Sequence, residues 1–148
     1  MLVDHNKLFK QFVRFTASVH QTSNEITKEI QVENITNTQY KILEFITVNQ
    51  PVTLTRISDC LNISLPNSSR ELKKLIENQL CEKVSDLKDR RIFHIRLTDK
   101  GTAIMEEAFQ QIQQVFQERM NDLTESELNE VGRAFRTLQE KVFLQTKA

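Results

Sequence analysis

The sequence predicts a mainly α-helical (α+β) protein with a single β-hairpin. Helix-start signals recur along the chain, whereas only one segment alternates apolar and polar residues with the two-residue period of a strand. At 148 residues, the chain has the length of one domain with a buried core. We therefore expect a single domain over residues 1–148.

Six helices follow from the start signals. Capping boxes begin at Thr36 and Thr124, where a glutamine or a glutamate stands three residues later. Thr53, Ser64 and Thr98 are further N-cap candidates. The expected helices cover residues 4–31, 37–49, 54–61, 65–78, 99–120 and 125–144. Asn62 tolerates the left-handed conformation, so the third and fourth helices are joined by a tight turn as a helix-turn-helix.

The hairpin is predicted immediately after this helix-turn-helix. Phe93, Ile95 and Leu97 share one face of a strand, and residues 80–84 can pair with that strand in antiparallel fashion. An isolated hairpin is marginally stable, so we expect its three apolar residues to pack on the helices. A hairpin in this place is a wing.

Charge is unevenly distributed along a chain whose formal net charge is zero. Residues 53–100 hold ten basic and seven acidic side chains, whereas residues 101–148 hold five and eight. A protein that binds a polyanion needs only one basic face, so the middle third is a candidate nucleic-acid surface. A solvated surface of mixed charge is the alternative interpretation.

Residues 57–101 resemble the winged helix of the MarR family of bacterial transcriptional regulators. Residues 35–43, ITNTQYKIL, resemble the second helix of that family, and the D-x-R of Asp89, Arg90 and Arg91 followed by LTDKG is its most specific motif here. The resemblance implies a winged helix-turn-helix over residues 36–100 and helical dimerisation parts at 1–32 and 101–148. It also implies a sequence-specific DNA-binding regulator, a repressor that binds a pseudopalindromic operator as a homodimer.

Four residues depart from the pattern of the family. Asn62 and Gln79 stand where the family often has glycine, and Ser68 and Glu71 stand at positions that are usually apolar. We therefore expect helix 65–78 to pack less deeply.

The fourth helix is the candidate recognition helix, whose first turns would face base edges in the major groove. Arg70 is the candidate for a bidentate guanine contact, and Asn67 for an adenine contact. The remaining candidates are Pro66 in the exposed first turn and Ser64, Ser69, Lys73 and Lys74 at phosphates. The alternative is an ordinary amphipathic helix in which Glu71 pairs with Lys74.

The wing has its own expected roles, implied by the family resemblance. Arg91 would enter the minor groove, Asp89 would hold its guanidinium, and Lys88 and Arg90 would lie beside phosphates. A planar, permanently charged guanidinium suits the negative potential of a narrow minor groove. The alternative is a surface ion pair that contributes little.

Apolar stripes on the long flanking helices predict a two-fold dimer, which would place two recognition helices about 34 Å apart. In the last helix the stripe repeats with coiled-coil spacing. The expected interface residues are Leu8, Phe9, Phe12, Ile112, Val115, Phe116, Leu128, Val131, Phe135, Leu138 and Val142. The core of a monomer would produce similar stripes.

A small aromatic or anionic effector is implied by the family resemblance, in a pocket between the dimer helices and the winged helix. Phe15, His20, Tyr40 and Phe45 lie on helices that could border such a pocket. The same residues could instead belong to the core.

Other chemistries find little support in the sequence. Cys60 and Cys81 lack the spacing of a zinc site, and we expect both as buried, reduced thiols. We expect neither an enzyme, a cofactor nor a metal. The apolar runs are too short to cross a membrane, so we expect a cytoplasmic protein. The competing function is a winged helix that binds another protein without specific DNA binding.

Overall fold

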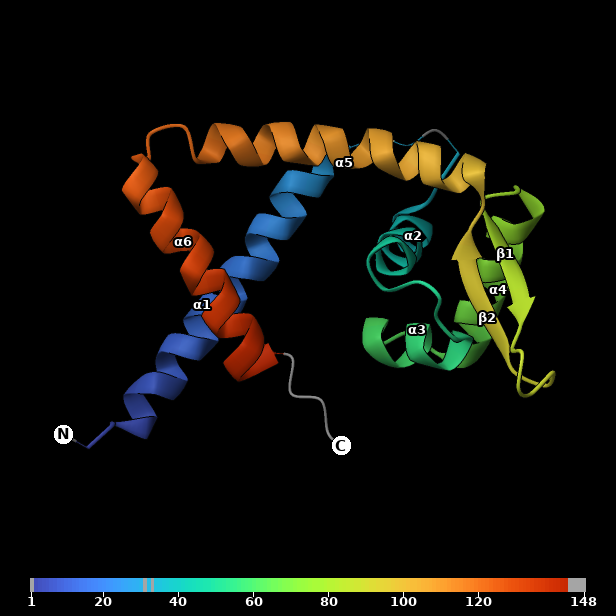
Figure 1. Cartoon of the computed structure of the whole chain (residues 1–148), viewed down its shortest axis with the longest axis horizontal. Coiled ribbons are helices and arrows are strands. Elements are labelled where there is room, and N and C mark those ends of the chain that lie inside the picture. Colours follow the sequence, from blue (N-terminus) through green and yellow to red (C-terminus); the bar gives the residue numbers. More distant parts are fainter. Residues whose placement is uncertain (1, 31, 33, 144–148) are drawn as a thin grey trace. The chain divides into compact units, whose positions relative to one another are not determined.

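The computed structural model describes residues 2–30, 32 and 34–143, which divide into two compact units, Met1–Ile112 and Gln113–Ala148. The chain is mainly helical with one antiparallel hairpin, as the sequence predicts (Figure 1). The elements of the first unit are α1 (His5–Lys28), α2 (Asn37–Asn49), α3 (Leu54–Leu61), α4 (Leu65–Glu77), β1 (Cys81–Ser85), β2 (Phe93–Leu97) and most of α5 (Asp99–Arg119). The second unit holds the end of α5, α6 (Glu125–Leu138) and the π-helical turn η1 (Gln139–Phe143).

Capping residues set most of these helix boundaries. The capping boxes at Thr36 and Thr124 are both present, and Thr53 and Ser64 accept hydrogen bonds from the first turns of α3 and α4. The expected bounds of α2 and α3 are therefore confirmed. The other helices differ at their ends: α1 runs from residue 5 to 28, and α4 and α5 end one residue earlier than expected. Helix α6 gives way to η1 after residue 138, and residues 31 and 144 lie outside the described part.

Two residues with positive φ flank helix α4. Asn62 closes α3 in the left-handed conformation, with φ 53° and ψ 46°, as the sequence predicts. Gln79, which follows α4, has φ 63°. This conformation is uncommon for a residue with a Cβ atom, and asparagine tolerates it more readily than glutamine. The chain thus turns sharply at both ends of α4.

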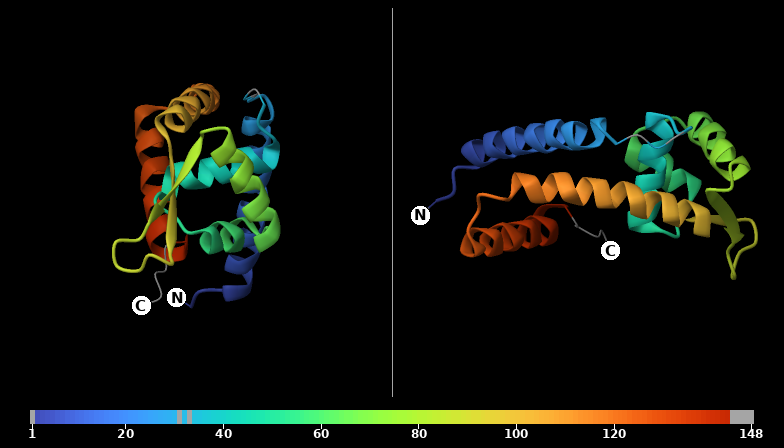
Figure 2. Two further views of the ribbon diagram at one scale, coloured as in Figure 1. Left: turned by 90° about the vertical axis from the view of Figure 1, so that its right-hand side faces the viewer. Right: turned by 90° about the horizontal axis from the view of Figure 1, so that it is seen from above.

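The hairpin is tied to the helices at its base. Strands β1 and β2 pair in register from Cys81 opposite Leu97 to Ser85 opposite Phe93. Val52, between α2 and α3, adds a bridge to Ile95: its N–H donates to the Ile95 carbonyl at 3.1 Å and its carbonyl accepts from the Ile95 N–H at 2.6 Å. The loop at the other end of the hairpin extends away from the helices (Figure 2).

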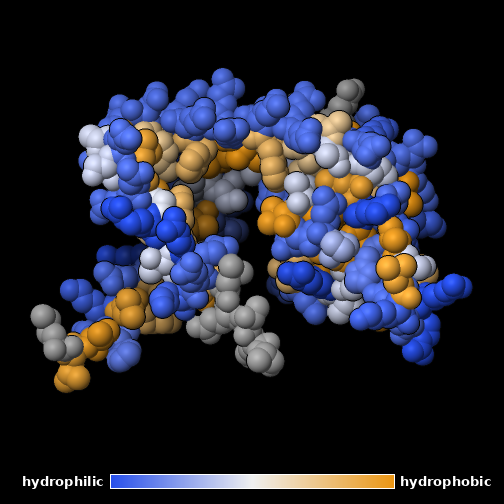
Figure 3. Space-filling view, viewed as in Figure 1, coloured by the Kyte–Doolittle hydropathy of each residue, from blue (hydrophilic) through white to orange (hydrophobic). Residues whose placement is uncertain are grey.

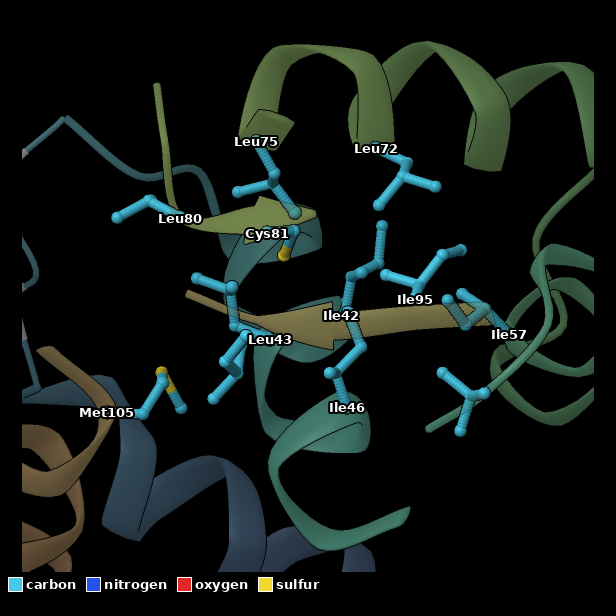
Figure 4. Packing of buried hydrophobic residues seen from close by; sticks show 12 residues of the cluster. Ile42, Leu43, Ile46, Ile57, Leu72, Leu75, Leu80, Cys81, Ile95 and Met105 are labelled. Atoms are coloured by element: carbon cyan, nitrogen blue, oxygen red, sulfur yellow. The ribbon is translucent and has the colours of Figure 1, made fainter. Parts of the chain in front are cut away.

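The core of the winged helix lies where α2, α3 and α4 meet the hairpin (Figure 4). Its members are Ile42, Leu43, Ile46, Val52, Ile57, Leu72, Leu75, Leu80, Cys81, Ile95, Leu97 and Met105. Helix α4 contributes Leu72 and Leu75, which are 2% and 0% exposed, and Ser68 is fully buried. The prediction that this helix packs less deeply is therefore wrong, because Ser68 is itself fully buried on the same face of α4 as Leu72 and Leu75.

One predicted anchor of the hairpin is not buried. Ile95 and Leu97 are 1% and 7% exposed, whereas Phe93 is 48% exposed. Phe93 lies at the loop end of β2, and its ring centroid is 5.9 Å from the Lys83 Nζ atom. The prediction for Phe93 is wrong because the strand extends past the helices that cover its base.

The two cysteines also differ from each other. Cys81 is buried, and burial raises the pKa of its thiol to about 12. Cys60 is exposed, so the prediction of a buried thiol is wrong there. The inward stripe of α3 runs through Ile57 and Ser58, and the 100° helical step turns Cys60 away from it.

The long helices bury far less than the winged helix. None of the described residues of α1 or α6 is buried. Apolar side chains on them are open, among them Phe9 at 62% and Phe135 at 52% exposure. Figure 3 shows hydrophobic surface at the N-terminal end of α1. No helix in the described ranges combines the length and apolar character that a membrane span requires.

Candidate nucleic-acid interface

Helix α4 presents a polar face opposite its buried one. Ser68, Leu72 and Leu75 point into the core. The predicted contact residues are all exposed: Ser64, Pro66, Asn67, Ser69, Arg70, Lys73 and Lys74. Ser64 caps the helix by accepting from the Asn67 N–H at 3.3 Å. The structure thus brings these residues together at the start and on the outer face of one helix.

Glu71 lies between the two faces of α4. Its Oε1 atom is 3.6 Å from the Lys74 Nζ atom, so the ion pair named in the alternative interpretation of this helix is present. Its Oε2 atom accepts a hydrogen bond of 2.9 Å from Gln39 Nε2. The sequence does not predict the bond from Gln39, because it joins residues 32 positions apart. Spacing along a single helix gives no signal for such a contact.

The wing loop holds an arginine in a bidentate pair. Asp89 accepts from Arg91 Nε at 3.1 Å through Oδ1 and from its terminal guanidinium nitrogen at 3.1 Å through Oδ2. Asp89 also accepts from the backbone N–H of Arg91 at 3.0 Å. These bonds, the side-chain one foremost, lower the pKa of Asp89. The Arg91 side chain nevertheless stays 90% exposed, and its charge is available at the surface.

A second aspartate shapes the same loop. Asp86 Oδ1 accepts from the backbone N–H groups of Lys88 and Asp89 at 2.7 and 3.1 Å, and Oδ2 lies 2.8 Å from His94 Nε2. The hydrogen bond from His94, followed by the two backbone bonds, lowers the pKa of Asp86. This role of Asp86 is absent from the sequence-based predictions. An aspartate at the first position of a turn is the available signal, since its side chain bonds backbone amides two residues on.

The remaining basic side chains near the wing are not equivalent. Lys88 and Arg90 are exposed on the loop, together with Arg91. Arg96 donates from Nε to Glu82 Oε1 at 2.6 Å across the hairpin. Hydrophilic side chains gather around the loop end in Figure 3. Three of the five basic side chains of residues 81–97 therefore lie in the loop: Lys88, Arg90 and Arg91.

The predicted effector residues divide into two groups. His20, Tyr40 and Phe45 line one pocket between α1, α2 and α3, with Glu44 and Cys60 among its other lining residues. Phe15 does not line this pocket. Burial and the neighbouring Glu44 carboxylate raise the pKa of the Tyr40 hydroxyl, which is therefore neutral at physiological pH. In the described part of the chain, no three His, Cys, Asp or Glu side chains form a metal-binding group.

Comparison with known proteins places this architecture in a class. Residues 35–101 match the family described as a winged helix DNA-binding domain. An uncharacterized HTH-type transcriptional regulator of Staphylococcus aureus (strain MRSA252) is 33% identical over 100 residues, which cover 67% of this chain and 68% of the relative. The HTH-type transcriptional regulator TcaR of S. aureus (strain Newman) is 26% identical over 144 residues, covering 95% of this chain and 93% of TcaR. The chain is therefore a transcriptional regulator with a winged-helix DNA-binding domain.

Solved structures of regulators share the fold of this chain. A MarR family protein from Bacillus stearothermophilus superposes with a TM-score of 0.69 at 20% identity, over 95% of this chain and 97% of that one. Wild-type MarR from E. coli superposes with a TM-score of 0.60 at 22% identity, over 93% and 98% of the two chains. These likenesses show that the chain has the fold of MarR-family winged-helix structures, the family that its D-x-R wing resembles.

Proposed function

We propose that the protein is a repressor that binds a pseudopalindromic operator as a homodimer and is released by a small ligand. In each protomer, α4 enters the major groove and the wing loop enters the adjacent minor groove. The observation that carries this proposal is the paired Asp89 and Arg91 at the end of the wing. The Arg91 guanidinium is hydrogen-bonded to the Asp89 carboxylate, while the Arg91 side chain is 90% exposed. The guanidinium is thus oriented by Asp89 and still accessible to DNA.

Recognition by α4 follows from its exposed face. Arg70 makes a bidentate contact to guanine and Asn67 to adenine, the pairings that the major-groove edges of these bases favour. Ser64, Ser69, Lys73 and Lys74 contact phosphates, which set the register without reading sequence. Lys88 and Arg90 do the same beside the minor groove. Charge complementarity supports the assignment, because these basic groups lie on one winged helix.

Dimerisation is supported by the open apolar faces of the long helices. Leu8 and Phe9 on α1, Phe116 on α5 and Leu128 on α6 are each at least 39% exposed. The apolar surface of such helices is buried most simply against a second copy with two-fold symmetry. The expected interface residues Phe12, Ile112, Val115, Val131, Phe135, Leu138 and Val142 complete these faces.

Release by a ligand is supported by the pocket that His20, Tyr40 and Phe45 share. It combines aromatic walls with polar groups, which suits a small aromatic or anionic molecule. The pocket borders both the winged helix and α1, which belongs to the proposed dimer interface. A ligand bound there would therefore change the orientation of the winged helix relative to the dimer interface. Phe15, which lies outside this pocket, is omitted from the proposed ligand contacts.

Selection of bound sites from random DNA, followed by salt titration on the selected operator, tests the proposal. With Arg91→Ala, log affinity is expected to fall less steeply with log salt concentration. The magnitude of the slope should decrease by about 0.9 for each neutralised phosphate that the substitution removes. Arg70→Ala is expected to cost about 1–3 kcal/mol and to relax preference at one base pair of each half-site. Arg133→Ala, on the face of α6 opposite its apolar stripe, is the matched control and should bind normally.

The proposal fails if Arg70→Ala and Arg91→Ala both bind the selected operator as the unaltered protein does. A selection that enriches no sequence would instead favour the competing function, a winged helix that contacts another protein. Half-sites separated by about one helical turn would support the dimer.

A further inference from the structure

The side chain of Gln39 joins the start of α2 to the recognition helix. It is only 5% exposed, although glutamine is usually a surface residue. Its Nε2 atom donates to Glu71 Oε2 at 2.9 Å, while its Oε1 atom accepts from the backbone N–H of Thr36 at 3.2 Å. These two bonds together fix the orientation of the amide group. In the flipped orientation, its NH2 group would face the Thr36 N–H and its oxygen would face the Glu71 carboxylate.

Glu71 receives this bond at the border of the core. Its side chain is 20% exposed, and its other oxygen lies 3.6 Å from Lys74 Nζ. In sequence it stands between exposed Arg70 and buried Leu72. Both carboxylate oxygens are thus engaged, one by α2 and one by the next turn of α4.

Apolar side chains from both helices also lie in the shared core. Helix α2 contributes Ile42 and Leu43, and α4 contributes Leu72 and Leu75 (Figure 4). Apolar burial holds the helices together but is not directional, so it resists separation more than rotation. A hydrogen bond to a carboxylate is directional and strong for its kind. Gln39 therefore adds a directional restraint on small rotations of α4 about its own axis to the apolar contacts that bury one face of the helix.

We propose that Gln39 is a positioning residue for DNA readout: by holding Glu71, it sets the direction in which Arg70 leaves α4. The proposal rests on the proposed function, in which α4 reads the major groove. Gln39 itself does not touch DNA. Its effect is specific to the operator, because a rotation of α4 changes base contacts more than the general attraction of phosphates.

Gln39→Glu is the variant that isolates this role. Glutamate at the same position can still accept from the Thr36 N–H, so the capping box of α2 survives. The donor to Glu71 is removed, and a second carboxylate faces the first. We expect affinity for the selected operator to fall about tenfold, with much less change on a scrambled duplex. Thr38→Glu, which adds the same charge at an exposed neighbour, is the matched control and should show no such difference between duplexes.

The double variant Gln39→Glu/Glu71→Gln provides the rescue. It exchanges donor and acceptor, so the amide at position 71 donates to the carboxylate at position 39. Operator affinity is expected to return to within about threefold of the unaltered protein, since the bond is restored. Glu71→Gln alone is measured as well, so that the simple effect of removing a charge near DNA is separated from the coupling.

All variants are compared at a temperature at which circular dichroism shows each of them folded. If Gln39→Glu does not fold, Glu71→Met removes the acceptor and leaves the capping box, and the ratio of operator to scrambled-duplex affinity should fall in the same way. The inference is overturned if Gln39→Glu binds the operator normally while Arg70→Ala does not, if the double variant shows no recovery, or if both duplexes lose affinity equally. Normal binding by Arg70→Ala and Arg91→Ala would instead overturn the proposed function, and this inference with it.

Discussion

The winged helix and the long helices use apolar residues in opposite ways. In the winged helix, Ile42, Ile57 and Leu75 are 0% exposed, and they pack on one another. In α1 and α6, none of the described residues is buried, and Phe9 and Phe135 are more than half exposed. The first region is stabilised by its own core, whereas the second has open apolar surface. Folding and the proposed dimerisation therefore involve different parts of this chain, and each can be perturbed separately.

Truncating one leucine in each region gives the largest expected contrast. Leu75→Ala removes a fully buried side chain from α4 and should lower the free energy of unfolding by about 2–5 kcal/mol. Leu128→Ala on α6 removes a side chain that is 43% exposed and should cost less than about 1 kcal/mol in dilute protein. Urea denaturation at several protein concentrations measures both. Equal losses at the lowest concentration would contradict the division of the chain into these two regions.

The two glycines of the chain offer the next contrast, with opposite signs. A Cβ atom at Gly101 would lie 2.1 Å from the carbonyl oxygen of Leu80, whereas one at Gly132 meets nothing within 4 Å. Gly101→Ala should therefore lower stability by at least about 2 kcal/mol, because backbone must move. Gly132→Ala should raise it by about 0.5–1 kcal/mol, because alanine favours the helix. Thermal unfolding followed by circular dichroism measures both, and changes of the same sign would refute the argument.

Two buried serines sharpen the description of the winged-helix core. Ser58 donates its hydroxyl to the Ile63 carbonyl, whereas the Ser68 hydroxyl has no hydrogen-bond partner among the described residues. Ser58→Ala should cost about 1 kcal/mol, and Ser68→Ala should be neutral or stabilising by a similar amount, since an unsatisfied polar group is removed. Chemical denaturation of the two variants measures both changes in the free energy of unfolding. A loss at Ser68 as large as that at Ser58 would mean that its hydroxyl is satisfied.

The smallest expected effect is a local change in the wing loop. Hydrogen bonds to the carboxylates of Asp86 and Asp89 stabilise this loop, whose described residues form no apolar core of their own. The pKa of Asp86 is lowered from its ordinary 3.8, so the ionised form is favoured in the folded loop. Its contribution is complete above pH 3.8 and is lost as the pH falls through the lower folded pKa. The protection factors of the Lys88 and Asp89 amides, which remove the intrinsic pH dependence of exchange, should therefore fall only in this acidic range. A loss of protection already at neutral pH would exclude Asp86 as the cause.

Local signals in the sequence are enough to predict the winged helix-turn-helix. Helices α2 and α3 have their predicted bounds because each has a capping residue at its start and a chain-breaking residue after its end. The hairpin follows from the alternation in β2 and the resemblance in its loop. The assignment of DNA, dimer and ligand contacts to particular residues stays a prediction.

What the sequence does not predict depends on contacts between distant segments. Phe93 continues the apolar alternation of β2, yet a strand pattern does not tell how far the covering helices extend. Burial of Ser68 and the bond from Gln39 to Glu71 both require two helices to be placed against each other. The bridge from Val52 to Ile95 involves a single residue, which has no periodicity to detect.

That bridge has a consequence for how such a regulator can diversify. Because Val52 joins the hairpin to the segment between α2 and α3, the wing and the helix-turn-helix are tied together within one protomer. Under the proposed function, substitutions on the exposed face of α4 would alter which bases are preferred without disturbing the wing. In the proposed dimer, changes in α1 and α6 would alter the separation of the two winged helices without disturbing base preference. Operator sequence and operator spacing would then evolve independently within one short chain.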